Sequence, residues 1–199
     1  LTFMYLPAQL LYPAMIIAGL VAFGTVMLVS FRRAINPGFA LAYAAIEGVF
    51  IGAISKVFES LYPGLVTPAV LGTFVAAGAT LFAYKAFRIK VTDKFRKMIV
   101  IGTIAYAGVL FVNFILSLFG VNTGIISVTG QVSVIARLAS AVGVGLAVFN
   151  LILDFDYIEQ GIAVRAPASE SWRAAFGLTV TMVWLYTEIL RILSYFQRN

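Results

Sequence analysis

The sequence predicts an all-α protein, a bundle of helices that crosses a membrane several times. Charged residues make up 11% of the 199 residues, whereas a soluble domain carries about 25%. Hydrophobic residues make up 62%, more than a soluble chain of this length can hide while keeping a wetted surface. The apolar runs also exceed the roughly ten residues of a membrane β-strand, so helices are expected.

Six segments are long enough to cross a bilayer, because a membrane helix needs about 20 mainly apolar residues. The first and the fourth carry no charged residue, turn-forming Pro and Gly residues precede the second and the third, and the fifth and the sixth contain acidic residues. Together they form one expected transmembrane domain over residues 1–199. The expected spans lie at about 10–31, 37–58, 65–87, 98–120, 132–154 and 174–196.

Residues 1–6 are interpreted as the remnant of a further helix, which would give the intact protein seven spans. Lys and Arg concentrate in alternate loops, at 32–33, 85–97 and 165–173. These loops are expected to be cytoplasmic, because positive charge is retained on that side. The net charge of +6 is therefore assigned to contact with anionic membrane lipid, and no nucleic-acid partner is expected.

The sequence contains neither cysteine nor histidine. This excludes disulfides, thiol chemistry, zinc sites built on these residues and Ser-His-Asp hydrolysis. An intramembrane aspartyl protease would need a Gly-X-Gly-Asp motif, but Gly143-Val144-Gly145 is followed by Leu146. We therefore expect neither an enzyme nor a cofactor. A secondary transporter remains an alternative, although no inverted repeat is visible.

Four charged residues are expected at membrane depth: Glu47, Asp154, Glu188 and Arg191. Glu47, for example, lies about 15 Å of helical rise beyond Pro37. Ionisable groups at this depth usually face a protein interior or a water-filled path, and they mark routes for ions or substrates. The alternative is a structural bridge, since Glu188 and Arg191 are three residues apart and can pair on one helix face.

The stretch LILDFDYIEQG, residues 151–161, contains three acids. Helical spacing places Asp154 on one face with Asn150 and Gly143, a stripe suited to contact with another helix. Asp156 points about 200° away from Asp154, since each helical residue turns by about 100°. We therefore expect Asp156 and Glu159 to meet water and Asp154 to be the buried functional carboxyl group. As an alternative, Asp156 and Asn150, with Glu47 and Arg191, could line a pore or form an ion pair.

Two carboxyl groups held together in a site of low dielectric constant cannot both ionise cheaply, so they share a proton. When the pair shares a proton, the two carboxyl groups would stay hydrogen-bonded in a closed state. When both groups are ionised, they would repel each other. The same oxygens would attract a hard cation such as calcium. A proton switch and a cation site thus remain alternatives.

Small residues recur at a spacing of four at Gly48/Gly52, Ala139/Gly143 and Ala141/Gly145. Small residues at this spacing let membrane helices approach closely. We expect these pairs to be helix contacts, with a hinge or gate as the alternative.

LILDFDYIEQG and VWLYTEILRIL (residues 183–193) resemble the last two helices of the Bax inhibitor family of transmembrane proteins. NPGFALAYAAIEGVFIGAISKVFE (residues 36–59) is similar to the bacterial branch of that family. The resemblance covers the whole chain and is strongest at 36–60 and 150–193. It implies seven transmembrane helices with the last at the centre, and location in a bacterial inner (plasma) membrane.

The resemblance further implies a pH-sensitive calcium leak channel in which acids on the last two helices share a proton. At the matching positions of this sequence the resemblance implies that these acids are Asp154 and Glu188, which are also the candidate calcium ligands. Family members more often have aspartate at the position of Glu188. Counting residues from the connecting loop puts the two about 15 Å apart in depth, unless the last helix begins after Ser171. The alternative cluster joins Glu188 to Glu47 or Arg191.

A competing function is a membrane regulator or scaffold that does not conduct ions and binds a membrane protease or a stress-response partner. It would leave the buried acids dispensable and depend on loop surfaces such as 85–97. A conducting channel, in contrast, has calcium ions and protons as its partners and requires the acids. We favour the channel.

Overall fold

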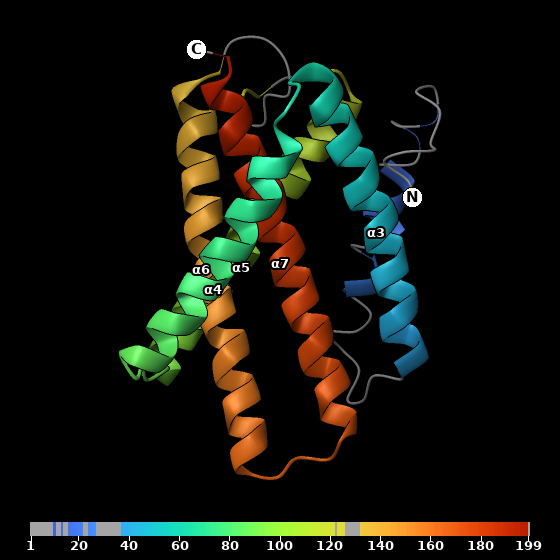
Figure 1. The fold of residues 1–199 in the computed structure, drawn as a ribbon. Helices are drawn as coiled ribbons and strands as arrows, with labels where there is room; N and C mark the ends of the chain where they lie inside the picture. The colour runs from blue at the N-terminus through green and yellow to red at the C-terminus, as the bar shows by residue number, and fades with distance from the viewer. Residues whose placement is uncertain are drawn as a thin grey trace.

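The computed structural model describes residues 10, 13, 16–21, 24–26, 37–121, 123–125 and 132–198. It contains long helices joined by short connections, and the described residues include no strand. This confirms the all-α fold class. The helices are α3 (Pro37–Leu61), α4 (Val66–Ala86), α5 (Asp93–Leu118), α6 (Val134–Ala163) and α7 (Ser169–Phe196) (Figure 1).

All five of these helices are long and apolar enough to cross a membrane. They correspond to the second through sixth expected spans. Of the first expected span, 10–31, only some residues are described, and those at 16–21 and 24–26 are helical. The expected helix remnant at residues 1–6 lies outside the described part of the chain.

Except for α4, each helix extends at one end beyond the apolar run that predicted it. α5 begins at Asp93, five residues before the expected start, because the Thr92 hydroxyl accepts a hydrogen bond from the backbone N–H of Phe95 (3.2 Å) and caps the helix. α6 continues nine residues past Asp154 to Ala163. Apolar length predicts the membrane-crossing part of a helix, whereas a polar cap outside that part fixes where α5 begins.

A sharp turn connects α3 to α4. Gly64 has a φ of 82°, a left-handed conformation that glycine adopts without steric cost. The carboxylate of Glu59 accepts hydrogen bonds from the backbone N–H groups of Gly64 (2.7 Å) and Val66 (3.0 Å). These bonds satisfy donors at the start of α4 that would otherwise lack partners.

α7 lies at the centre of the described bundle, as the resemblance implies. It packs against α3, α4 and α6, whereas α5 packs mainly on α6 (Figure 1). α3 and α7 run in the same direction, because Tyr43 packs on Phe176 near their first turns (ring centroids 4.5 Å apart) and Ser55 contacts Tyr186 further along (2.6 Å). α7 is therefore covered by neighbouring helices on several sides.

The outward faces of α4 and α5 are apolar. Phe74 and Phe82 on α4 are 66% and 71% exposed, and Ile101 and Ile104 on α5 are 66% and 67% exposed. Large apolar side chains of this kind are stable when they face lipid. These faces therefore form the lipid-facing surface of the bundle.

Candidate functional site

Three acidic side chains lie inside the bundle around α7. Glu47 on α3 is 6% exposed and Glu188 on α7 is 1% exposed. Asp154 on α6 is partly buried, with the oxygen Oδ2 inaccessible to solvent. Carboxyl groups at membrane depth are costly unless hydrogen bonds, opposite charges, protons or cations compensate them. The partners of each group therefore indicate its role.

Glu188 has a complete set of partners. The Tyr106 hydroxyl of α5 donates a hydrogen bond to Oε1 (2.8 Å), and Arg191 Nη1 donates to both carboxylate oxygens (3.1 and 3.0 Å). This confirms the expected pairing of Glu188 with Arg191 on one helix face. Tyr106, Glu188 and Arg191 together form a neutralised cluster that ties α5 to α7.

Gly143 on α6 makes room for this cluster. A Cβ atom at Gly143 would lie only 2.7 Å from Glu188 Cδ and 2.9 Å from Glu188 Oε1, and would also clash with the Tyr106 hydroxyl. Any larger residue would have to displace a buried, hydrogen-bonded charge. The close contact expected for the Ala139/Gly143 pair is therefore present at Gly143, where the neighbour is a polar side chain.

Asp154 faces α7 from α6. Its Oδ1 lies 3.5 Å from where a Cβ atom of Gly177 would be, and the Thr181 side chain lies beside the carboxylate. Oδ2 is buried and has no hydrogen-bond partner among the described residues. Asp154 therefore contacts another helix, as expected, but with an incomplete set of partners.

Glu47 lies on the same face of α3 as Tyr43, which packs on Phe176 of α7. It accepts a hydrogen bond from the hydroxyl of Tyr43, one helical turn earlier. Its second oxygen, Oε2, is buried and has no hydrogen-bond partner within the described part of the bundle. Because Tyr43 packs on Phe176 and the two helices are parallel, Glu47 lies near the level of Val180, one turn further along α7.

Glu47 and Asp154 thus lie at a similar depth on two different helices that both pack on α7. Asp154 contacts α7 at Gly177 and Thr181, and Glu47 lies near the level of Val180. Both carry a buried oxygen without a hydrogen-bond partner among the described residues. This arrangement places two incompletely compensated carboxyl groups at one level of the bundle.

The structure does not bring Asp154 and Glu188 together. Glu188 packs against Gly143, which precedes Asp154 by 11 residues on α6, a rise of about 16 Å. The two acids could have paired if the last helix began after Ser171, but α7 is already helical from Ser169. In this arrangement the two carboxylates form neither a shared hydrogen bond nor a joint calcium site, and the expected alternative of Glu188 with Arg191 is the one observed.

The expectation that Asp156 meets water is wrong. Asp156 is 8% exposed, and its Oδ2 accepts hydrogen bonds from Arg96 (2.8 Å) and Gln160 (2.7 Å). The ion pair weighed as its alternative is therefore the one observed. Asp156 points away from Asp154, as the helical spacing predicts, but α5 covers that side of α6. Glu159 is exposed as expected, and it accepts a hydrogen bond from Tyr84 of α4 (2.6 Å).

Asn150 faces α5. Its side-chain amide donates to Thr103 Oγ1 (2.8 Å) and to the backbone carbonyl of Leu146 (2.8 Å). Asn150 therefore fixes the contact between α5 and α6, and the face that it shares with Gly143 and Asp154 meets α5 as well as α7. Both bonds are internal, so we assign Asn150 a structural role.

Replacement of Arg96 with methionine is expected to destabilise the protein only slightly. Arg96 is 45% exposed, so water screens its side of the pair, and solvent-exposed ion pairs contribute about 1 kcal/mol or less. Gln160 also continues to donate to the same carboxylate oxygen. The free energy of unfolding, measured in mixed detergent, should fall by about 1 kcal/mol relative to the Lys94→Met control. A loss above about 3 kcal/mol, the range of a fully buried pair, would contradict this assignment.

Sequence reasoning missed the partners of the acids: Tyr43, Tyr106 and Arg96. Tyr43 could have been found, because it precedes Glu47 by four residues and so shares its helix face. Tyr106 and Arg96 lie on α5, and their contacts depend on how α5 packs. No local pattern reports that packing.

Comparison with known proteins supports the resemblance noted from the motifs. A family model described as Bax inhibitor 1 like matches residues 1–198. A search of curated proteins gave no match. The family match therefore covers the helices that carry the buried acids.

Proposed function

The chain belongs to the Bax inhibitor 1 like family, and from that premise we propose that it is a pH-sensitive leak channel for calcium in a bacterial plasma membrane. Its helices make it an integral, multi-pass membrane protein. The observation that carries the proposal is the buried Oδ2 of Asp154, which has no hydrogen-bond partner among the described residues. Such an oxygen is stabilised either by a proton or by a cation.

Competition between protons and cations for the same oxygen gives the pH dependence. At high pH an ionised Asp154 attracts a cation, which favours an open path. At low pH a proton neutralises the group and removes this attraction. The proposed channel therefore conducts more as the pH rises.

We assign Glu47 as the acid that acts with Asp154. Pairing Asp154 with Glu188 would need α6 and α7 to slide by about 16 Å, or about three helical turns, whereas known helix shifts are of one turn or less. Glu47 already lies at the level of Asp154 and also has a buried oxygen without a partner in the described bundle. Glu188 then holds α5 and α7 together through Tyr106 and Arg191.

Asp154→Asn is expected to lower calcium flux by about tenfold, equivalent to about 1.4 kcal/mol, and to flatten its dependence on pH. Asparagine keeps the size of the side chain but can neither ionise nor attract a cation. The protein would be reconstituted in liposomes loaded with a calcium indicator, and the rate of flux measured from about pH 5 to about pH 8, where buried carboxyl groups titrate. Asp93→Asn, which changes an exposed carboxylate at the start of α5, is the matched control.

Glu47→Gln tests the second acid in the same assay, and a flattened pH profile is expected. An unaltered profile in both variants would contradict the assignment of the two acids. If the unmodified protein passes no calcium at any pH, the channel proposal fails. The alternative, a scaffold that binds a protease or a stress-response partner, would then be favoured.

A further inference from the structure

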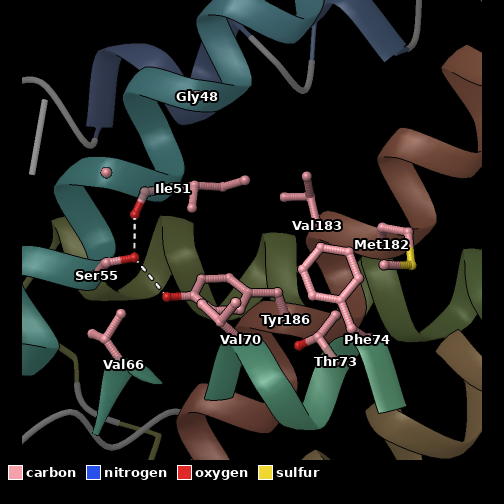
Figure 2. Close-up of a pocket in the computed structure, with 11 residues that line it drawn as sticks. Gly48, Ile51, Ser55, Val66, Val70, Thr73, Phe74, Met182, Val183 and Tyr186 are labelled. Atoms are coloured by element: carbon pink, nitrogen blue, oxygen red, sulfur yellow. Dashed lines mark hydrogen bonds between the residues drawn. The ribbon is translucent and has the colours of Figure 1, made fainter. Parts of the chain in front are cut away.

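A pocket of about 410 Å³ lies between α3, α4 and α7 (Figure 2). Its volume falls in the range of small-molecule sites, about 300–1,000 Å³. None of the buried acids, Glu47, Asp154, Asp156 and Glu188, lines it. The pocket is therefore separate from the carboxyl site and needs its own explanation.

Glycine hollows out the α3 side of the pocket. Gly48, Ile51, Gly52 and Ser55 line it from a single helix face. A Cβ atom on Gly48 would meet no described atom of the bundle within 4 Å. The expectation that Gly48 brings two helices into contact is therefore wrong, because the missing side chain leaves open space.

The hydroxyl groups of the pocket are already hydrogen-bonded within the protein. Ser55 donates to the backbone carbonyl of Ile51 (2.6 Å), so the Tyr186 hydroxyl, 2.6 Å from Ser55 Oγ, is the donor in that contact. Thr73 donates to the carbonyl of Ala69 (2.7 Å). Figure 2 shows Ser55 pointing at both Ile51 and Tyr186.

The remaining lining is apolar. Val66, Val70 and Phe74 of α4 face Met182 and Val183 of α7 across the pocket. No charged side chain is among the lining residues that the structure describes. With neither charge nor a free hydroxyl donor, the pocket suits an apolar occupant better than an ion or a polar solute.

The pocket is continuous with the lipid-facing surface. Phe74 and Val70, which line it, are 66% and 37% exposed. Leu71 and Val75, their neighbours on α4, are 60% and 69% exposed and face lipid. The molecules that meet this surface in a membrane are lipid acyl chains, so an acyl chain has direct access to the pocket.

We propose that the pocket between α3, α4 and α7 binds an acyl chain of a membrane phospholipid. Ser55 and Val66 lie near the turn between α3 and α4, and Gly48 lies about 10 Å deeper along α3. A chain from the leaflet on the side of that turn runs inward along this path. Burial of its methylene groups between the three helices stabilises it. This inference does not depend on ion conduction.

Photo-crosslinking tests the proposal. The full chain would be reconstituted in vesicles of phosphatidylethanolamine and phosphatidylglycerol that contain a phospholipid with a diazirine in one acyl chain. After irradiation, peptide mass spectrometry locates the adducts. Adducts at Met182 and Val183 should exceed those at Ile101 and Ile104 of the lipid-facing surface severalfold.

Gly48→Phe fills the pocket and should reduce the adducts at Met182 and Val183 severalfold. Gly78→Phe is the matched control, because a Cβ atom there also meets no described neighbour within 4 Å, yet Gly78 does not line the pocket. Val70→Trp fills the pocket from α4 and serves if Gly48→Phe does not fold, as judged by gel filtration.

Adducts that are spread evenly over the pocket and the α5 surface would overturn the proposal. So would adducts at Met182 and Val183 that persist in a folded pocket-filling variant. The assay does not measure flux. Its failure and the failure of the channel proposal are therefore distinguishable.

Discussion

Arg191→Met is expected to destabilise the protein by about 3–5 kcal/mol, the cost of leaving one member of a buried ion pair without its partner. Arg191 is the only cation that bonds Glu188 among the described residues, and it contacts both carboxylate oxygens. The Glu188 side chain is 1% exposed, so water cannot take over. The single hydrogen bond from Tyr106 would remain.

The measurement is reversible unfolding in mixed detergent, with Arg96→Met as the matched control. Both variants remove an arginine from an ion pair of similar length, 3.0 Å for Arg191 and 2.8 Å for Arg96, but the arginine is 15% exposed in the first pair and 45% in the second. The double variant Glu188→Gln/Arg191→Met should recover most of the loss, because it removes the isolated charge as well. Equal effects of the two single variants would show that burial of the Glu188 pair does not control its contribution.

Gly143→Ala is expected to destabilise the protein by about 1–3 kcal/mol, the usual cost of adding atoms to a packed core. The new methyl group would lie 2.7 Å from Glu188 Cδ, so the carboxylate must move and its bond with Tyr106 lengthens. Thermal unfolding in detergent measures the loss of stability. The tyrosine fluorescence of a Trp-free background, compared with that of Tyr106→Phe, reports the broken contact.

Gly145→Ala is the matched control, two residues further along α6. A Cβ atom there meets no described neighbour within 4 Å, and alanine is favoured over glycine in a helix by about 1 kcal/mol. Gly145→Ala should therefore leave stability unchanged or raise it slightly. If both substitutions have the same sign, the close contact at Gly143 is not what limits stability there.

The sequence was sufficient to predict the helices because the physical requirement is simple: a span must be apolar over the thickness of a bilayer. Local spacing was also sufficient for the pair of Glu188 and Arg191, three residues apart on one face. Counting helical rise gave a depth difference of about 15 Å for Asp154 and Glu188, and the contacts of Gly143 support about the same value. Each of these inferences uses only one helix or one loop.

Predictions that needed the position of a second helix were less successful. Asp156 points away from Asp154, as helical phase requires, yet Arg96 of α5 covers it. Gly48 has the spacing of a helix contact, yet it borders a pocket. Helical phase specifies a direction from one helix axis, whereas burial depends on which neighbour lies in that direction. Residue spacing along the chain does not contain that information.

The position of α7 at the centre has a consequence for biosynthesis. The ribosome makes α7 after α3 and α6, so the helix that packs on both acid-bearing helices enters the membrane only after Glu47 and Asp154 are already there. An acid at the centre of an isolated membrane helix costs about 2.5–3.5 kcal/mol during insertion. A nascent chain that ends before α7 therefore lacks the helix that packs against both acid-bearing helices, and arrival of α7 completes the bundle.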